Sequence, residues 1–188
     1  MGRNDIRIYY CKMDTDLSKS EKLHLAANLY LKEKSCPPTD VKTVHKNKWG
    51  KPYFPNSPQV NFSISHSGDY WICGFSQAPL GLDLQEHRKG DYARLSQRFF
   101  HPLEDIFLKG GNYEDFFSLW TAKESYVKYI GTGFIKESSS FSVIDNESLI
   151  AMGKMERVTF KHLTFIAGYS LCVCSKRIDE VKISSLSL

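Results

Sequence analysis

Apolar residues in this chain repeat with two different periods, and each period is confined to its own stretches of sequence. Apolar and polar residues alternate over Ile6–Tyr10 and again over Val60–Ile64. A period of two predicts β-strands with one buried face. Further strands are expected at Tyr70–Phe75 and Gly81–Gln85, where apolar runs lie between polar turns.

A helical period replaces the alternation after the first strand. The spacing predicts a helix from about Ser18 to Lys34, because Ser18 and Glu21 form a capping-box pattern at its start. Pro37 and Pro38 are expected to end it. Residues 39–60 are polar and rich in proline, so they are expected to be loop with short extended pieces.

Three helices are expected in the second half of the chain. The first begins at Asp91 and ends at His101-Pro102, where Pro102 starts the second. The longest helix follows a turn at Gly110-Gly111 and ends at Gly131 and Gly133. Its acidic first turn and its buried face are formed by Glu114, Asp115, Phe116, Phe117, Trp120, Val127 and Ile130.

Three strand-like segments, Phe141–Val143, Arg157–Leu163 and Tyr169–Cys174, finish the chain. Strands mixed with helices predict an α+β fold, and 188 residues suit one domain over residues 1–188. The pattern Tyr-x-x-Cys-x-x-Ser occurs at 70–76 and again at 169–175. This echo allows two related half-domains that meet face to face.

Composition excludes several classes of protein. With 41% hydrophobic residues and 24% charged residues, the chain is not a coiled coil, a collagen-like repeat or a disordered tail. A formal net charge of +4 suits an anionic ligand or an acidic partner, and equally an ordinary solubility charge. The five cysteines include no CxxC pair, so neither a disulfide framework nor a four-cysteine zinc site is expected. Without a signal-peptide pattern or a membrane-spanning stretch, a cytoplasmic protein with no membrane partner is expected.

Asp83 and Gln85 are two residues apart on a predicted strand. Their side chains therefore leave the same face, about 6.5 Å apart along the strand, while Leu82 and Leu84 face the core. Two oxygen ligands at this spacing can share one hard cation such as Mg²⁺. An exposed acidic strand end is the alternative explanation for so short a pattern.

Glu124 lies on the predicted longest helix, with Trp120 four residues before it and Lys128 four residues after it. Its carboxylate is thus expected at the edge of the apolar face, half-buried or directed into a cleft. A simple surface pair between Glu124 and Lys128 would explain the same spacing.

Two loop segments carry groups suited to phosphate. Lys51 precedes Pro52, so its backbone is extended and its ammonium is available as a point charge. Ser65 and His66, followed by Ser67 and Gly68, offer a hydroxyl, an imidazole and free N–H groups. Each is also an ordinary surface or turn residue when taken alone.

Five short motifs occur together and in order: GKPYF at 50–54, NFSISHSGDY at 61–70, GLDLQ at 81–85, RFFHPLE at 98–104 and SLWTAKESYVK at 118–128. With this ordered set the chain closely resembles the Sfp-type 4'-phosphopantetheinyl transferases. The resemblance covers residues 49–133 and implies two pseudo-symmetric α/β half-domains, about 1–79 and 80–188, with the site in the cleft between them.

The resemblance implies a role for each matching residue. Asp83 and Glu124 would bind Mg²⁺, or alternatively Mn²⁺, together with the pyrophosphate of coenzyme A, which is the substrate. Lys128 would contact phosphate near the reacting centre, and Glu124, or a metal-bound water that it orients, would take the proton of the attacking serine. The residues matching those that hold the nucleotide and its phosphates are Lys51, Ser65, His66, Lys123 and Lys128.

The implied partners are coenzyme A and apo acyl or peptidyl carrier proteins, which would dock through the apolar residues around Phe99, Phe100 and Leu103. A monomer is expected to suffice. Two departures from the family stand out. Gln85 replaces a glutamate that is often the third metal ligand. The N-terminal half is short, so the basic residues at hand for the 3'-phosphate are Lys22, His24, Lys32 and Lys34.

Two readings from other classes compete with the transferase. The first is a catalytically weakened module that binds coenzyme A or a carrier protein. The second is a small nucleic-acid-binding domain, suggested by the positive charge and the 13% aromatic residues. The lysines are scattered and no nucleic-acid-binding signature occurs, so no nucleic-acid partner is expected.

Overall fold

Two β-sheets lie side by side in the computed structural model, which describes residues 3–34, 39–131, 138–144 and 158–186. In order across the larger sheet, the strands are β4 (Asn61–Ser67), β5 (Tyr70–Ser76), β1 (Asp5–Lys12) and β9 (Glu180–Ser185). In order across the second sheet, they are β6 (Leu80–Glu86), β8 (Tyr169–Ser175) and β7 (Thr159–Leu163). All pairings are antiparallel except that of β1 with β9. A short hairpin is formed by β2 (His45–Lys46) and β3 (Pro52–Tyr53).

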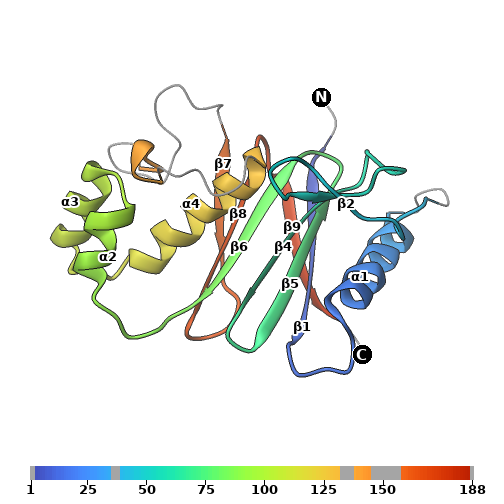
Figure 1. The fold of residues 1–188 in the computed structure, drawn as a ribbon, viewed down its shortest axis with the longest axis horizontal. Coiled ribbons are helices and arrows are strands. Elements are labelled where there is room, and N and C mark those ends of the chain that lie inside the picture. The colour runs from blue at the N-terminus through green and yellow to red at the C-terminus, as the bar shows by residue number, and fades with distance from the viewer. Residues whose placement is uncertain (1–2, 35–38, 132–137, 145–157, 187–188) are drawn as a thin grey trace.

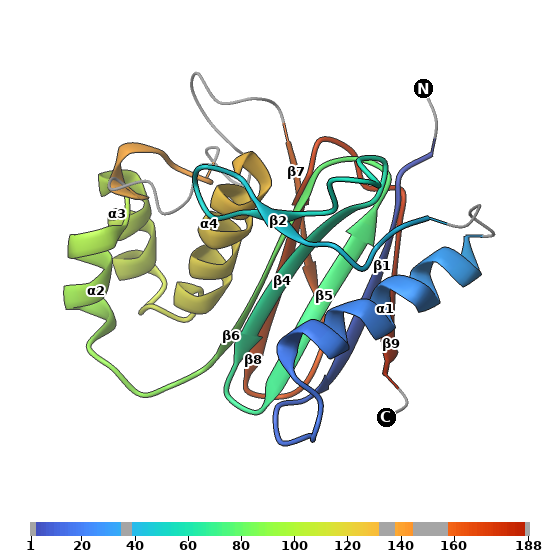
Figure 2. The same ribbon diagram turned by 45° about the vertical axis from the view of Figure 1, so that its right-hand side comes forward.

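The helices cover the two ends of this arrangement. α1 packs against the larger sheet, whereas α2, α3 and α4 gather beside the second sheet (Figure 1; Figure 2 shows the same arrangement turned by 45°). Their bounds are α1 (Lys19–Glu33), α2 (Tyr92–Phe99), α3 (Pro102–Gly110) and α4 (Phe116–Ile130), and a short 3₁₀ turn, η1, covers Ser138–Ser140. The expected mixture of helices and strands is therefore confirmed.

Local signals in the sequence explain where the helices begin and end. The capping box of α1 is present, because the Ser18 hydroxyl accepts from the Glu21 N–H and the Glu21 carboxylate accepts from the Ser18 N–H. Pro102 occupies the first turn of α3. α4 ends at Gly131, whose φ of 66° is the left-handed conformation that favours glycine.

Several details of the predicted elements were wrong. Phe141–Val143 is not a strand, because the Glu104 carboxylate, in place of a neighbouring strand, accepts from the Val143 N–H. Glu114 and Asp115 precede α4, since the turn before it runs through Tyr113 in the left-handed region.

Burial of the α4 side chains followed the expectation only in part. Phe116 and Val127 are buried, whereas Phe117, Trp120 and Ile130 are only partly buried. The strand β9 was not expected, although Val181 and Ile183 alternate in it. Pro37, Pro38, Gly133 and Arg157 lie outside the described residues.

The two sheets share an apolar interior. Ile6 and Ile8 of β1 and Ile72 of β5 pack in one cluster with residues of the second sheet, namely Leu80, Leu82, Leu84, Leu171 and Val173. These side chains are at most 1% exposed. Burial of this size stabilises the contact between the sheets strongly, at about 25 cal/mol per Å² of apolar surface.

Three serine hydroxyls join the facing edges of the two sheets. Ser63, Ser65 and Ser67 of β4 accept hydrogen bonds from the N–H groups of three alternate residues of β6 at 3.0, 3.2 and 3.0 Å. The donors, in the same order, are Leu82, Leu84 and Glu86. Because the residue numbers of both series increase together, β4 and β6 run parallel. In a continuous sheet the carbonyls of a neighbouring strand would accept from these N–H groups, and here serine hydroxyls take that place. We call this set the serine ladder.

Gly81 fixes how closely β6 approaches α4. A Cβ atom at this position would lie 1.8 Å from the Ser125 carbonyl oxygen and 2.5 Å from the Tyr129 nitrogen, both of them backbone atoms of α4. Only glycine permits this approach, which brings β6 and α4 together beside Asp83.

Gly81→Ala is therefore expected to lower the free energy of unfolding by about 3 kcal/mol, because strand and helix must separate to admit the methyl group. Denaturant unfolding measures this loss. Gly110→Ala is the matched control, since a Cβ atom there meets nothing within 4 Å. That control is expected to be neutral or slightly stabilising, and equal losses in both variants would contradict the packing argument.

Candidate active site

Asp83 lies in β6 on the face that α4 covers. The strand register pairs Asp83 with Cys172 of β8, and Asp83 is only 6% exposed. Leu82 and Leu84 face the apolar interior, as the alternation predicted. An exposed strand end is thus ruled out for Asp83, and a carboxylate buried to this extent needs charged or hydrogen-bonding partners.

Those partners come from two other elements. The Lys128 ammonium, on α4, lies 2.7 Å from the Asp83 Oδ1, and the Ser65 hydroxyl, on β4, lies 2.9 Å from the same oxygen. The Lys128 ammonium also lies 3.0 Å from the Ser65 Oγ. Three residues that are far apart in the sequence therefore form one closed triangle of polar contacts.

Glu124 lies one helical turn before Lys128, and its carboxylate has no hydrogen bond to another residue in the described part of the chain. Its pKa is raised, first because burial disfavours the charged form and then because the Asp83 carboxylate is close, while Lys128 and Lys123 oppose the rise. A surface pair of Glu124 with Lys128 is therefore not what the structure shows, since Lys128 bonds to Asp83 instead. Two carboxylates share one site.

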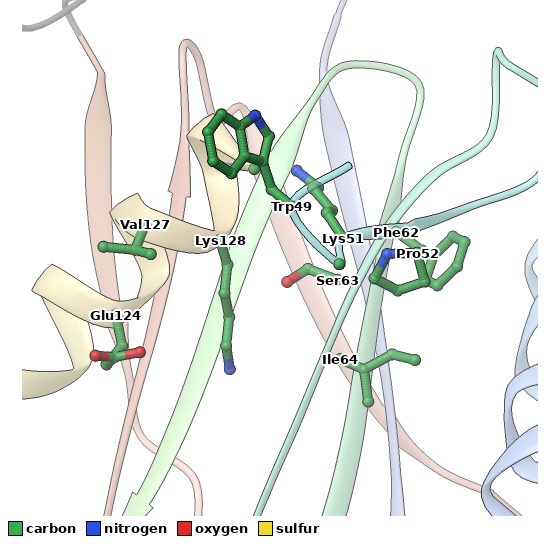
Figure 3. Close-up of a pocket in the computed structure, with 11 residues that line it drawn as sticks. Trp49, Lys51, Pro52, Phe62, Ser63, Ile64, Glu124, Val127 and Lys128 are labelled. Carbon is green, nitrogen blue, oxygen red and sulfur yellow. The ribbon is translucent and has the colours of Figure 1, made fainter. Parts of the chain in front are cut away.

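Two adjoining open cavities surround these groups. The first, of about 420 Å³, is lined by Ile64, Ser65, His66, Asp83, Leu84, Gln85, Trp120, Glu124 and Lys128. The second, of about 280 Å³, is lined by Trp49, Gly50, Lys51, Pro52, Phe62, Ser63, Ile64, Glu124, Val127, Lys128 and Gly131. Figure 3 shows Glu124 and Lys128 on α4 on one side of the second cavity, with Ser63 and Ile64 of β4 on the other. Ile64, Glu124 and Lys128 line both cavities, and Glu124 and Lys128 are the charged residues among them.

The donor atoms at the first cavity fit a hard divalent cation. Asp83 and Glu124 supply carboxylates, and Gln85, half-buried beside them, supplies an amide whose nitrogen donates to the Glu86 carbonyl. Within the described ranges, no three His, Cys, Asp or Glu side chains are grouped to hold a metal by themselves. Such a set suits Mg²⁺, which takes one or two protein carboxylates and completes its shell with waters and substrate phosphates.

Lys51 is held away from these oxygens. Its ammonium donates to the carbonyls of Leu80 at 3.3 Å and Tyr129 at 3.0 Å, so it ties the start of β6 to the end of α4. Burial lowers the pKa of Lys51 to about 8. In the structure the Lys51 ammonium is thus bonded to backbone carbonyls, although Lys51 lines the second cavity.

Lys123 points away from Glu124, into the packing between α4 and α3. Its ammonium lies 2.7 Å from the Glu104 carboxylate and 2.6 Å from the Phe141 carbonyl oxygen, with Phe141 also under a cation–π contact of 4.1 Å. Its side chain is 5% exposed and that of Glu104 is 0% exposed. The implied phosphate-binding role of Lys123 therefore does not match its placement here.

His66 borders the first cavity and has a partner that the sequence analysis did not single out. The Lys19 ammonium at the start of α1 lies 3.1 Å from the His66 Nε2. Burial, Lys19 and Lys128 together lower the pKa of His66. By contrast, Lys22 is buried with its ammonium on the carbonyls of Lys12 and Met13, and no sequence pattern distinguished the two lysines.

The raised pKa of Glu124 predicts a pH dependence of stability for the metal-free protein. The pKa of this carboxyl group is higher in the folded state than its ordinary value of 4.5. At pH values between the unfolded and the folded pKa, the folded state therefore binds more protons than the unfolded state, and the free energy of unfolding falls as pH rises through this range. Glu124→Gln is expected to remove this fall. Denaturant unfolding in a chelator between acid and neutral pH measures it, and identical pH slopes for wild type and variant would contradict the electrostatic description.

The fold and this site define a class of protein. The model of the 4'-phosphopantetheinyl transferase superfamily matches residues 79–174, which is half of the chain and includes β6, α4 and all of β8 except Ser175. The chain belongs to this superfamily. The expected resemblance is confirmed.

Curated relatives agree with this assignment. The chain is 34% identical over 137 residues to the 4'-phosphopantetheinyl transferase gsp of Aneurinibacillus migulanus, covering 69% of this chain and 56% of that protein. It is 33% identical over 140 residues to the 4'-phosphopantetheinyl transferase Sfp of Bacillus subtilis strain 168, covering 70% of this chain and 62% of that protein. This chain therefore spans little more than half the length of these relatives. None of its helices, in the part that the structure describes, has the length and apolar character to cross a membrane.

Proposed function

We propose that this protein transfers the 4'-phosphopantetheine arm of coenzyme A to a serine of an apo acyl or peptidyl carrier protein, releasing 3',5'-ADP. The observation that carries the proposal is the meeting of Asp83, Glu124 and Lys128 at one cavity. Membership of the superfamily and the activity for which the relatives are named support the same assignment.

The reaction needs charge neutralisation more than covalent chemistry by the protein. The serine oxygen of the carrier forms a bond to the β-phosphorus, and the bond from that phosphorus to the bridging oxygen breaks. The electron pair of this bond leaves with 3',5'-ADP, and the serine proton must reach a base. A magnesium ion held by Asp83, Gln85 and Glu124 would neutralise the pyrophosphate and stabilise the leaving group.

Lys128 and Glu124 are charged residues of the protein that would act directly on the reacting groups. Lys128 places a fixed positive charge on the wall shared by both cavities, where the transferred phosphate would lie. In the metal-free protein the pKa of Glu124 is raised. The base for the serine proton would be either the Glu124 carboxylate or, when Glu124 holds the cation, a metal-bound water that it orients.

The second cavity suits the nucleotide part of coenzyme A. Trp49, Pro52, Phe62 and Val127 give it apolar walls, and it opens beside Lys128. Carrier protein would approach from α3, where Leu103, Ile106 and Phe107 are exposed by 51%, 66% and 44%. Of the other expected contact residues, Phe100 is buried and Phe99 is only partly exposed. Exposed apolar side chains in one place commonly mark a contact surface.

Mass spectrometry of intact apo carrier proteins tests the proposal. Carriers are incubated with this protein, coenzyme A and Mg²⁺, and a parallel reaction contains EDTA. A gain of one phosphopantetheine arm that EDTA abolishes is the expected result. No gain on any acyl or peptidyl carrier, despite measured binding of coenzyme A, would support the second candidate, a module that binds coenzyme A without transfer.

The placement of Lys51 and Gln85 favours that second candidate over unrelated functions. Lys51 donates to backbone carbonyls, and Gln85 brings no charge to the metal site. Gln85→Glu tests this explanation, because a carboxylate at this position should produce or increase transfer if the missing charge weakens the metal site, and should leave transfer unchanged if it does not.

We also propose that the chain consists of two related halves, about 1–79 and 80–188, and acts as a cytoplasmic monomer. The repeated Tyr-x-x-Cys-x-x-Ser segments form β5 and β8, one in each sheet, and the Tyr70 and Tyr169 rings are in edge contact at 5.3 Å. Asp83, Glu124 and Lys128 all come from one chain, which supports a monomer. Sedimentation equilibrium tests the oligomeric state.

A further inference from the structure

The hydroxyl of Ser65 has used its full hydrogen-bonding capacity within the protein. A serine hydroxyl has one proton to donate and two lone pairs that accept. The Ser65 Oγ accepts from the Leu84 N–H at 3.2 Å and from the Lys128 ammonium at 3.0 Å. Its proton is therefore left for the Asp83 Oδ1 at 2.9 Å.

This arrangement leaves little capacity in Ser65 for a phosphate. The residue is only 6% exposed, so exchange of partners with solvent is restricted. A phosphate oxygen is an acceptor and would have to take the proton now given to Asp83. The phosphate contact implied by the family resemblance thus competes with contacts that the protein already makes.

Both partners of the Asp83 carboxylate bind the same oxygen. Ser65 and Lys128 bond to Oδ1, and among the described residues no hydrogen bond or ion pair is formed with Oδ2. An oxygen held twice fixes the orientation of the carboxylate, and the remaining oxygen is then presented in one direction. Hydrogen bonds that orient a metal-binding carboxylate typically affect metal affinity or activity by 10–100-fold.

We propose that Ser65 is a positioning residue that orients Asp83 and Lys128 by joining them to the serine ladder, so that the Asp83 Oδ2 is held ready for the cation. The proposal rests on the proposed function only for the identity of the reaction. The hydrogen bonds on which the proposal depends are formed within this chain. The affinity for the cation is measured directly, without the transfer reaction.

The serine ladder itself provides the matched control. Ser67 accepts from the Glu86 N–H at 3.0 Å, as Ser65 does from Leu84, but Ser67 neither contacts Asp83 or Lys128 nor lines either cavity of the site. Ser65→Ala and Ser67→Ala therefore each remove one rung of the ladder. Only the first also removes the hydrogen bonds of Ser65 with Asp83 and Lys128.

The experiment measures Mn²⁺ binding by electron paramagnetic resonance, with and without 3',5'-ADP, in the full chain. Ser65→Ala is expected to weaken Mn²⁺ binding about tenfold or more, whereas Ser67→Ala stays within about twofold of wild type. Ser65→Thr keeps a hydroxyl and is expected to retain most of the affinity. Denaturant unfolding establishes that all variants are folded under the conditions used.

Steady-state kinetics separates positioning from phosphate binding. A positioning role predicts a kcat lowered about 10–100-fold by Ser65→Ala, with the KM for coenzyme A within about threefold of wild type. A raised KM with unchanged Mn²⁺ affinity would overturn the proposal in favour of a phosphate contact. Equal Mn²⁺ affinities of Ser65→Ala and Ser67→Ala would also overturn it. If wild type shows no transfer, the proposed function fails, while the Mn²⁺ comparison still decides the role of Ser65.

Discussion

Glu124→Gln is expected to lower the rate of phosphopantetheine transfer about 10³-fold, because the amide neither neutralises a cation nor accepts a proton as a carboxylate does. The same change is expected to leave the metal-free protein at least as stable as wild type at neutral pH. Burial and the nearby Asp83 both disfavour the ionised carboxylate, as its raised pKa records. A large loss of activity without loss of stability would identify a functional group.

The measurement is kcat for a carrier protein at saturating Mg²⁺, together with denaturant unfolding in EDTA. Glu114→Gln is the matched control, since Glu114 is exposed and lies before α4, away from both cavities of the site. Asp83→Asn should behave like Glu124→Gln in transfer. Unchanged transfer in both active-site variants would remove the basis for a metal site between them.

The buried pair of Glu104 and Lys123 predicts the largest effect on stability. Glu104→Ala is expected to lower the free energy of unfolding by about 3–5 kcal/mol, because it leaves the Lys123 ammonium buried without its counter-charge. The Glu104 carboxylate also accepts from the N–H groups of His101 at 2.9 Å and Val143 at 2.8 Å. Its loss therefore loosens α3, α4 and the segment after η1 at once.

Denaturant unfolding of Glu104→Ala against Lys109→Ala measures this effect. Lys109 forms an exposed pair with Asp105 on α3, so its removal is expected to cost less than about 1 kcal/mol. A double variant, Glu104→Met with Lys123→Met, should recover part of the loss, because no unpaired charge remains buried. Similar losses for Glu104→Ala and Lys109→Ala would show that the pair contributes no more than a surface one.

The parts of the site that the sequence predicted are those governed by local periodicity. A period of two placed Asp83 opposite in direction to Leu82 and Leu84, and the helical period placed Glu124 at the edge of an apolar face. Both expectations hold in the structure. Local periodicity also located the helices α1 to α4 to within a few residues.

The parts that the sequence did not predict depend on contacts between distant segments. Lys51 and Lys123 are both basic residues in family motifs, yet their ammonium groups meet backbone carbonyls 29 and 18 residues away. Nothing near either lysine in the chain specifies those partners. Lys128, with the same local appearance, reaches Asp83 instead, 45 residues away.

The serine ladder also determines which residues of β4 face β6. Serine hydroxyl groups occupy alternate positions of β4. A slip of one residue along β4 would therefore place Ile64 and His66 opposite the N–H groups of β6, and the three hydrogen bonds of the ladder would be lost. The alternate serines of this short strand thus specify its register relative to β6. Among the described strands, β4 and β6 belong to separate sheets with no main-chain ladder between them. The serine ladder therefore sets the alignment of the two sheets, and with it the β4 residue that meets the Asp83 carboxylate.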